Sequence, residues 1–389
     1  MKNIALIFGG EATEREVSIV TAYQIEKMCD RKKYNLMCVL IDENKKMFWC
    51  KKGIDVKQCA KPQPCSKDYE EIVFAAGAVW KTGGRRLKKI CNVDLALVAC
   101  HGGSGENGEL VAKLNLDGIK TSVGVPEALG IAMDKAVAKC VLEKSGICVV
   151  EGLCIFEKDW KENKKRIFEL IQDFGYPVIV KPARQGSSVG IGIAKCEDEL
   201  EAVVNLALEF DNKILVERAL IDFKEYNVSV LKSEKEFLIS GIEEAFKSGD
   251  FLSFEDKYFG GAKNSGLQKF APKSSKMSGF DAFARQKSCK MQSFGMENMD
   301  RQMVKNLASE VADKIFEYAK KSVEVLELYG VVRIDFLVDS SGTVYLNEIN
   351  AVPGSLAFYF WRGFDFFDRL VDAGLCGVGK KKGSVAKFL

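Results

Sequence analysis

Histidine is almost absent from this chain of 389 residues: the only one is His101. The thirteen cysteines are odd in number and irregularly spaced, and none belongs to a Cys-x-x-Cys pair. Zinc clusters are built from closely spaced cysteines and histidines, so this composition argues against one. Several cysteines lie in apolar runs, as buried free thiols do. We therefore expect a reducing compartment and predict a cytoplasmic protein.

Long hydrophobic runs and an excess of charge are missing too. No stretch of about 18 apolar residues occurs, so no membrane partner is expected. The apolar part of the N-terminal MKNIALIFGG is short, which predicts a first strand rather than a signal peptide. The net charge is +3, from 57 basic and 54 acidic residues, which does not favour a nucleic-acid partner.

The length predicts two or three domains. Strand-like runs at residues 4–8, 34–42 and 93–100 alternate with helical or glycine-rich segments, which is typical of a parallel α/β domain, here ending near residue 122. Ligands of such sheets bind beyond the carboxyl ends of the strands, where Glu14 and His101 fall. Residues 43–89 look irregular and are interpreted as an elaboration.

The middle of the chain predicts further helices and strands. One helix is expected from Pro126 to about Lys144, with proline at its start and Gly146 just past its end. Strand-like runs at 176–182 and 191–196 flank a glycine- and serine-rich loop, and a helix at 197–210 and a strand at 212–220 follow. Residues 222–258 look antiparallel. Residues 260–300 are long for a loop, and loops of this kind are often lids or locally disordered.

The stretch GVVRIDFLVDSSGTVYLNEIN, residues 330–350, predicts a hairpin with an unusual polar face. A turn centred on 340–341 places Arg333 opposite Glu348, with Asp335 as its diagonal neighbour. Because side chains alternate along a strand, Asn350 shares that face. Two carboxylates and a carboxamide beside a cation suit Mg²⁺ and a bound phosphate. An edge hairpin with one solvated face fits the same residues.

The loop at 184–192 could cover phosphates with its backbone N–H groups, although it is neither a P-loop nor a dinucleotide-binding motif. An ordinary hairpin turn is the alternative. Lys181 ends the preceding apolar strand, and an ammonium group there needs an anionic partner. Lys135 and Lys257 could each lie on a solvated face. Together with Arg333 and the two carboxylates, these lysines indicate a site for a metal-bound nucleotide.

Eight motifs resemble, in sequence and order, those of the D-alanine–D-alanine ligases of the ATP-grasp superfamily. The match runs from residue 4 to about 356, and 43–89 and 260–300 contribute little to it. The motifs are IFGGEATEREVSIVTA, ACHGGSGENGEL, AMDKAVAK, YPVIVKPARQGSSVGI, ILVERAL, FEDKY, VVRIDFLVD and YLNEINAVPG.

The resemblance implies an α/β fold in which an N-terminal parallel α/β domain precedes a two-subdomain ATP-grasp fold. The implied parts are residues 1–122, a central ATP-grasp subdomain at 123–216, and a C-terminal subdomain at 217–389 with the metal and catalytic residues. ATP and two Mg²⁺ ions, or Mn²⁺ in their place, are the implied cofactors. D-alanine is the implied small-molecule substrate, and a homodimer is expected.

The resemblance also implies a role for each matching residue. Glu14, Ser187 and Tyr258 resemble a hydrogen-bonded triad over the site, with Glu14 receiving the first substrate's ammonium group and His101 bordering that pocket. Arg333 and the backbone of Gly354 resemble the groups that stabilise the acyl phosphate and the tetrahedral intermediate. Asp335, Glu348 and Asn350 resemble the metal ligands. The residues that resemble the nucleotide site are Lys135, Lys181, Ser188, Glu217, Arg218, Leu220, Glu225 and Lys257.

The sequence departs from the family pattern after Gly354, where it reads SLAFYFW. Either Ser355 and Leu356 are displaced, or Phe358 and Tyr359 reshape the pocket for the second amino acid. The expected reaction is ligation of two D-alanines through an acyl phosphate, for peptidoglycan precursor synthesis. A related ligase with D-serine, D-lactate or an L-amino acid as acceptor is the alternative, and a non-catalytic nucleotide-binding protein is a second one.

Overall fold

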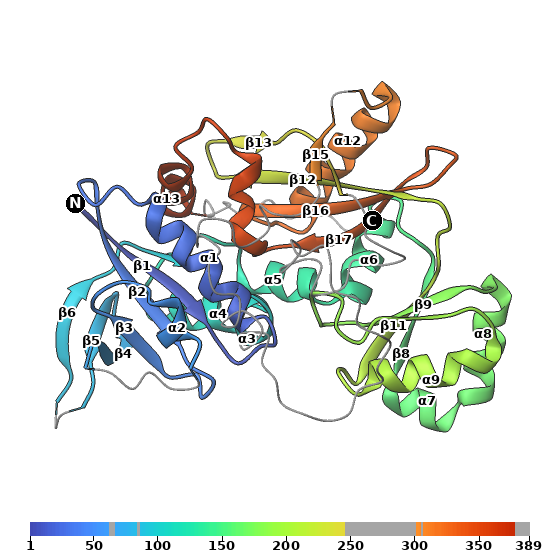
Figure 1. The fold of residues 1–389 in the computed structure, drawn as a ribbon, viewed down its shortest axis with the longest axis horizontal. Helices are drawn as coiled ribbons and strands as arrows, with labels where there is room; N and C mark the ends of the chain where they lie inside the picture. The colour runs from blue at the N-terminus through green and yellow to red at the C-terminus, as the bar shows by residue number, and fades with distance from the viewer. Residues whose placement is uncertain (62–66, 84–85, 246–300, 305, 378–389) are drawn as a thin grey trace, which may run out of the picture.

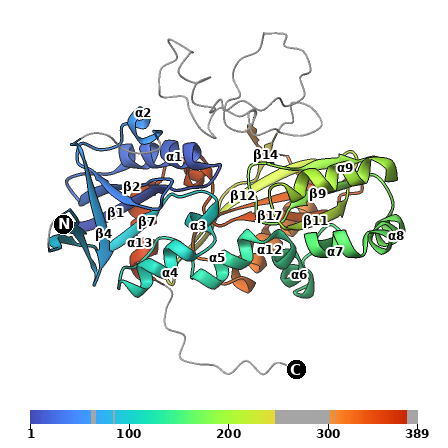
Figure 2. The same cartoon turned by 90° about the horizontal axis from the view of Figure 1, so that it is seen from below.

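The structure, a computed structural model, describes residues 1–61, 67–83, 86–245, 301–304 and 306–377. Its strands form three sheets, which follow one another along the chain (Figure 1). The view in Figure 2 separates the N-terminal sheet, in blue, from the two later sheets. The mixed α/β class predicted from the sequence is confirmed.

The first sheet has seven strands in the order β6-β5-β4-β3-β2-β1-β7. Its parallel part consists of β2, β1 and β7, as predicted. The interpretation of residues 43–89 as irregular is wrong, because β3 to β6 extend the sheet as an antiparallel meander. The strands are β1 (Lys2–Gly9), β2 (Tyr34–Ile41), β3 (Met47–Cys50), β4 (Tyr69–Ala75), β5 (Ala78–Lys81), β6 (Lys88–Asn92) and β7 (Leu95–Val98).

Helices connect these strands and lead out of the sheet. They are α1 (Arg15–Met28), α2 (Val56–Cys59), α3 (Gly103–Glu106), α4 (Glu109–Leu116), α5 (Pro126–Met133) and α6 (Lys135–Lys144). The single helix predicted from Pro126 to Lys144 is two helices. Asp134 has an extended backbone, and its side chain caps α6 by accepting a hydrogen bond from the Val137 N–H at 3.1 Å. The break makes Lys135 the first residue of α6.

The second sheet is a separate small unit with the order β10-β9-β11-β8 and three helices beside it. It has its own hydrophobic cluster, which includes Ile171, Val180 and Val216. Its elements are β8 (Gly152–Phe156), α7 (Glu157–Glu162), α8 (Lys164–Phe174), β9 (Val178–Pro182), β10 (Gly192–Ala194), α9 (Glu197–Leu208) and β11 (Lys213–Arg218).

The third sheet has the order β15-β14-β12-β16-β17, with β13 added beside β12. Its strands are β12 (Lys224–Lys232), β13 (Phe237–Ile239), β14 (Glu243–Ala245), β15 (Arg301–Met303), β16 (Gly330–Val338) and β17 (Val344–Asn350). The helical segments around it are α12 (Ser309–Val325), η2 (Gly354–Phe360) and α13 (Phe366–Cys376). The proposed lid at 260–300 lies outside the described residues.

The hairpin of β16 and β17 has the predicted polar face but a different register. Arg333 lies opposite Asn350, and Asp335 lies opposite Glu348. The prediction that Arg333 lies opposite Glu348 is therefore wrong by two residues. A shift of two leaves every side chain on its original face, so the four polar residues still face the same way.

Two separate one-residue shifts produce this register. The turn has three residues rather than two, ending at Gly342 with a positive φ of 85°. The second shift is a bulge, because Phe336 pairs with Leu346 while Asp335 pairs with Glu348, which leaves Asn347 as the extra residue. Either shift alone would have turned Glu348 away from Arg333 and Asp335. The bulge is therefore what keeps the polar face together.

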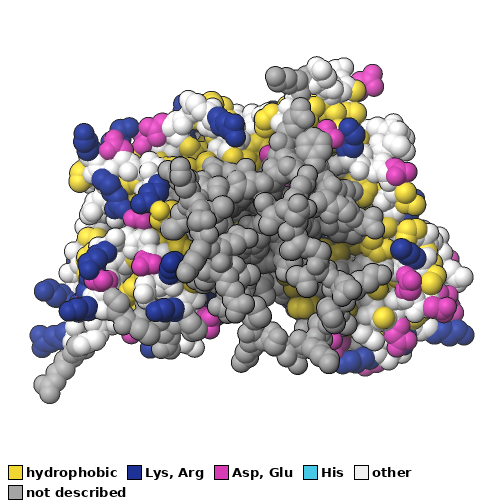
Figure 3. All heavy atoms as spheres, in the orientation of Figure 1, with side chains coloured by type: hydrophobic (Ala, Val, Ile, Leu, Met, Phe, Trp, Pro, Cys, Tyr) yellow, Lys and Arg dark blue, Asp and Glu magenta, His cyan; other side chains and the backbone are white. Residues whose placement is uncertain are grey.

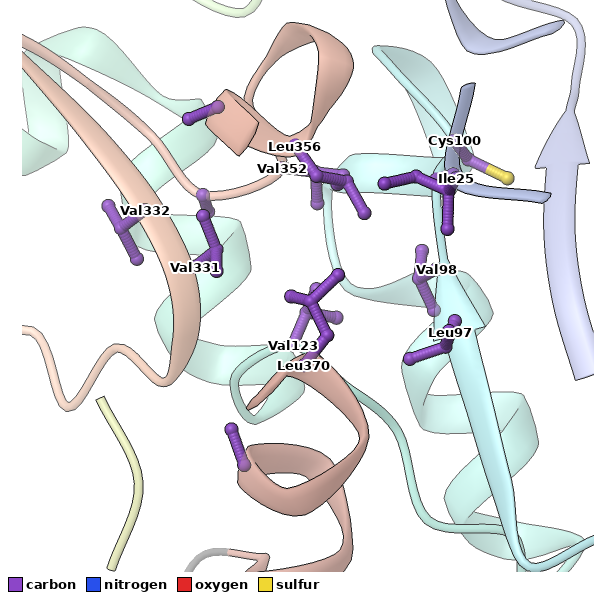
Figure 4. Packing of buried hydrophobic residues seen from close by; sticks show 14 of the residues in the cluster. Ile25, Leu97, Val98, Cys100, Val123, Val331, Val332, Val352, Leu356 and Leu370 are labelled. Atoms are coloured by element: carbon purple, nitrogen blue, oxygen red, sulfur yellow. The ribbon is translucent and has the colours of Figure 1, made fainter. Parts of the chain in front are cut away.

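One continuous hydrophobic core joins the first and third sheets. In Figure 4, Leu97 and Val98 of β7 lie near Val123 and Leu370, and Val331 and Val332 belong to the same cluster from β16. Figure 3 shows basic and acidic side chains interspersed over the described part of one face. Within the described residues, no helix is both long and apolar enough to cross a membrane.

Candidate active site

A pocket with an empty volume of about 1020 Å³, part of it open to solvent, lies where the three sheets approach one another. Strands of the third sheet border it, together with the segment before α1, the segment after β7, helices α5 and α6, and the loop between β9 and β10. The polar residues and glycines that border it include Glu14, His101, Glu106, Lys135, Lys139, Gly186, Ser187, Glu225, Asn227, Arg333, Asn347, Glu348, Asn350 and Gly354.

Glu14 precedes α1 and meets the glycine- and serine-rich loop from the second sheet. The Ser187 hydroxyl donates a hydrogen bond to Glu14 Oε1. A Cβ placed on Gly186 would lie 2.6–2.9 Å from the Glu14 carboxylate, so only glycine permits this approach. Ser187 itself has a positive φ of 50°, which is uncommon for a residue other than glycine. The structure therefore brings together two members of the predicted triad, while Tyr258 lies outside the described residues.

His101 and Glu106 are held in the loop that follows β7. His101 is 3% exposed and uses both ring nitrogens, contacting Thr21 Oγ1 at 2.9 Å and Val352 O at 2.8 Å. Burial lowers the pKa of His101 to about 4, and the charge of Arg333 adds to this effect. Burial and the nearby Glu14 raise the pKa of Glu106 to about 7. Near neutral pH the histidine is therefore neutral, and Glu106 is close to its midpoint.

Lys135 connects α6 to the same glycine- and serine-rich loop. Its backbone N–H donates to Ala183 O at 3.0 Å, and its ammonium group donates to Gln185 O. Asp134, just before it, pairs with Lys213 of β11 at 2.8 Å. These three contacts tie the start of α6 to the second sheet and the loop that follows β9. Lys135 borders the pocket, as expected for a lysine that contacts phosphate.

Three buried charges form a cluster beside the pocket, and one of them, Lys139, borders it. Glu217 is 1% exposed and pairs with Lys139, and with Lys181 at 2.6 Å. Burial alone would raise the pKa of Glu217, but the two ammonium groups outweigh it and hold the pKa below its usual value. Lys181 also donates to Asn347 Oδ1 at 3.3 Å, which links the second sheet to the bulge of β17. The predicted adenine-contacting Glu217 therefore holds the predicted phosphate-contacting Lys181.

Arg333 and Asp335 form a buried bidentate pair, with Nε to Oδ1 and the terminal nitrogen to Oδ2 both at 2.7 Å. The Asn350 side chain donates to Asp335 Oδ2 at 3.2 Å. With its amide nitrogen facing Asp335, Asn227 donates to Oδ1 at 3.1 Å. A carboxylate has about four acceptor positions, so these donors fill those of Asp335.

Two of the three predicted metal ligands border the pocket, and the third, Asp335, does not. Glu348 and Asn350 border the pocket, and so does Asn347, which the bulge turns toward it. Carboxylate and amide oxygens are the hard ligands that Mg²⁺ prefers, so this donor set fits a divalent cation. Asp335 fits less directly, because it would have to release one of its N–H donors before binding a metal.

Nine of the predicted site residues border the pocket: Glu14, His101, Lys135, Ser187, Glu225, Arg333, Glu348, Asn350 and Gly354. Six others do not border it, namely Lys181, Ser188, Glu217, Arg218, Leu220 and Asp335, and Lys257 and Tyr258 lie outside the described residues. Phe358 and Tyr359 do not border it, and their rings pack on each other and against the main core, with Phe358 beside Phe366.

Sequence reasoning missed five polar residues of this region: Glu106, Lys139, Gln185, Asn227 and Asn347. Two of them carried a signal in the sequence. Lys139 lies one helical turn after Lys135, and Glu106 lies in the glycine-rich run after His101. Asn347 carried none, because its orientation depends on the bulge.

Comparison with known proteins gives consistent results along the whole chain. Two family models match, the D-ala D-ala ligase N-terminus at residues 3–122 and the D-ala D-ala ligase C-terminus at 141–279 and 282–361. The D-alanine–D-alanine ligase of Thermosipho melanesiensis is 32% identical, over 98% of this chain and 96% of that protein. The enzyme of Clostridium novyi is 31% identical, over 91% of this chain and 89% of that protein.

Solved structures show the same fold. The D-alanine–D-alanine ligase of Helicobacter pylori matches with a TM-score of 0.70 and 25% identity, over 98% of this chain and 99% of that one. A D-Ala:D-Ser ligase from Enterococcus faecalis matches with a TM-score of 0.74 and 24% identity, over 96% and 99% of the two chains. The family models, the relatives and the folds agree, and this chain belongs to the D-alanine–D-alanine ligase family.

Proposed function

We propose that this protein joins two D-alanines to D-alanyl-D-alanine in an ATP-dependent reaction, for peptidoglycan precursor synthesis. The observation that carries the proposal is the composition of one pocket. Glu14, Lys135, Arg333 and Glu348 border it from four separate parts of the chain, and Gly354 joins them. Such a set combines an ammonium acceptor, phosphate-binding cations and oxygen ligands, which is what a ligase of this kind needs.

The reaction proceeds in two steps. The carboxylate of the first D-alanine attacks the γ-phosphorus of ATP, and ADP leaves. The amine of the second D-alanine then attacks the carbonyl carbon of the acyl phosphate, loses a proton and displaces inorganic phosphate. The protein contributes mainly by positioning its substrates and neutralising charge, as in phosphoryl transfer generally.

Each residue has a proposed part in these steps. Glu14 holds the ammonium group of the first D-alanine, and the Ser187 hydroxyl orients the Glu14 carboxylate by donating a hydrogen bond to it. Lys135 and Lys181 contact the phosphates of ATP. Arg333 neutralises the acyl phosphate, and the Gly354 N–H donates to the oxyanion of the tetrahedral intermediate.

The metal belongs to the same proposal. Glu348 and Asn350 would hold Mg²⁺, and Asp335 would join them after giving up one hydrogen bond. A bound Mg²⁺ supplies neutralisation of the phosphate charge. The cytoplasmic location, the homodimer and the roles of Lys257 and Tyr258 stay predictions.

The decisive experiment measures phosphate release and identifies the product. Purified protein with ATP and Mg²⁺ should release phosphate only when D-alanine is added, and the product should be D-alanyl-D-alanine by mass and chirality. L-alanine should be inactive, and D-serine should be incorporated weakly, because one added hydroxyl changes the size of the D-alanine side chain only slightly. A dominant product with an L-residue or a hydroxy acid would refute the substrate assignment. Phosphate release that ignores amino acids would refute the ligase itself.

A further inference from the structure

The backbone after Gly354 makes a turn that L-amino acids avoid. Ser355, Leu356 and Ala357 have φ values of 55°, 45° and 52°, all in the left-handed region. None of them is glycine, and all three are buried. Conformations of this kind are unfavourable and persist only where the surrounding structure holds them in place. The contacts that hold this turn therefore bear directly on the position of Gly354.

The main polar contact comes from another domain. Thr21 lies in α1 of the N-terminal domain and is 1% exposed. Its hydroxyl oxygen accepts a hydrogen bond from the Ser355 N–H at 2.9 Å. Figure 4 shows Leu356 and Val352 lying together near Ile25 of α1, so apolar packing accompanies this bond.

His101 determines which group donates and which accepts in the hydrogen bonds that link it to Val352 and Thr21. Val352 O can only accept, so the proton of the neutral imidazole lies on Nδ1, 2.8 Å away. Nε2 is then an acceptor, and the Thr21 hydroxyl, at 2.9 Å, donates to it. Thr21 still accepts from the Ser355 N–H. Each group in this chain of bonds therefore has one role, and the hydroxyl of Thr21 is its central member.

Glu106 completes the arrangement on the other side. Its carboxylate accepts from the Val352 N–H at 3.4 Å and from the Gly102 N–H at 2.9 Å. The N-terminal domain thus holds both polar groups of Val352 and the N–H of Ser355. Gly354 lies between these two anchored residues. We call Thr21, His101 and Glu106 the interdomain clamp.

We propose that Thr21 is a positioning residue of the ligation reaction, because the interdomain clamp fixes the backbone of 352–355 and so aims the Gly354 N–H at the reacting carbonyl. This inference rests on the proposed role of Gly354. Thr21 itself does not border the pocket. Its effect should therefore fall on the rate of the chemical step and spare the affinity for ATP.

The test compares Thr21→Val, which removes the hydroxyl and keeps the shape, with Thr21→Ser, which keeps the hydroxyl. Thr121→Val is the matched control, because Thr121 is also buried and donates to the Val123 carbonyl, away from this site. We expect kcat of Thr21→Val to fall roughly 10- to 100-fold. KM for ATP should stay within about twofold of wild type, since a small misplacement of reacting groups lowers the rate without weakening remote binding. Thr21→Ser and Thr121→Val should keep most of the rate.

Wild-type kcat in Thr21→Val would overturn the inference, and so would an equal loss in Thr21→Ser, which would point to packing instead. If Thr21→Val does not fold, Thr21→Ala replaces it with the same expectations. Hydrogen exchange at the Ser355 amide gives a readout without catalysis: protection should fall in Thr21→Val and stay in Thr21→Ser. A wild-type protein that makes no dipeptide would refute the proposed function, while unchanged exchange at Ser355 would refute the clamp.

Discussion

At the scale of single residues, the close approach of Gly186 to Glu14 allows a sharp prediction. In Gly186→Ala the new Cβ would lie 2.6–2.9 Å from the Glu14 carboxylate, so that carboxylate must move. We expect KM for D-alanine to rise about tenfold or more, which corresponds to the loss of roughly 1.4 kcal/mol of binding. The melting temperature should change little.

The control for this variant is Gly124→Ala, where the nearest atom to the new Cβ is 3.6 Å away, an ordinary contact. Steady-state kinetics with both variants would decide the matter. Equal KM values for Gly186→Ala and Gly124→Ala would mean that Glu14 does not bind the substrate ammonium group.

The raised pKa of Glu106 predicts how the substitution Glu106→Gln changes the pH dependence of stability. Its pKa rises from 4.5 to about 7 on folding, because burial and Glu14 disfavour its charge. Between these values the folded protein binds more protons than the unfolded chain, so this group makes the protein less stable as pH rises. Glu106→Gln removes the titration. Relative to wild type, the variant should therefore gain unfolding free energy from pH 4.5 to 7, up to about 3 kcal/mol.

Urea unfolding of both proteins at several pH values measures this difference. His101 has the opposite effect on stability. Its pKa falls from 6.5 to about 4 on folding, so between these values the folded protein binds fewer protons than the unfolded chain and becomes more stable as pH rises. The wild-type curve alone therefore mixes the two groups, and the difference between the proteins is what matters. A difference that stays constant with pH would contradict the raised pKa of Glu106.

At the scale of secondary structure, the break between α5 and α6 depends on Asp134. Its side chain caps α6 and also pairs with the buried Lys213 of β11. Asp134→Ala removes the cap and leaves a buried ammonium group without that partner, so we expect a loss of about 3 kcal/mol. Asp55 caps α2 from an exposed position, and Asp55→Ala should cost about 1 kcal/mol. Equal losses in denaturant unfolding would show that the pair with Lys213 adds nothing.

The sequence predicted the elements better than their connections. A long run of apolar residues was a sufficient signal for β1, β2 and β16, whose side chains are mostly buried. It failed for β3 and β5, which have four residues each and gain their stability from neighbouring strands. The hairpin shows the same limit. Its polar face was predictable from alternation, but the register depends on a three-residue turn and a bulge that are set by three-dimensional packing.

The same reasoning explains which site residues the sequence could supply. Glu14, His101 and Lys135 belong to motifs that can be read along the chain. The ion pairs of Glu217 could not be predicted, because Lys139 and Lys181 come from different elements that meet only after folding. For Asp335, the face of the strand on which it lies was predicted correctly, but its bidentate hydrogen bond to Arg333 was not.

At the scale of the whole molecule, two hydrophobic cores meet at one pocket. The second sheet has its own core, whereas the first and third sheets share theirs. Units with separate cores can unfold separately unless contacts between them are strong. We therefore expect two calorimetric transitions without ligand, with the lower one belonging to residues 152–218.

A nucleotide should join these two units. Lys181 lies in the smaller unit, while Arg333 and Glu348 lie in the larger one, and a phosphate chain held between them would contact both. A ligand that binds only the assembled state stabilises it in proportion to the logarithm of its concentration over Kd. A non-hydrolysable ATP analogue with Mg²⁺ should therefore raise the temperature of the lower transition toward that of the upper one.

Two lysine variants test this prediction. Lys181→Ala should abolish most of this shift, because it removes the contact from the smaller unit. Lys161→Ala, on the exposed face of α7, should leave it intact. If the analogue raised only the upper transition, the nucleotide would bind the larger unit alone, and the proposed role of Lys181 would be wrong.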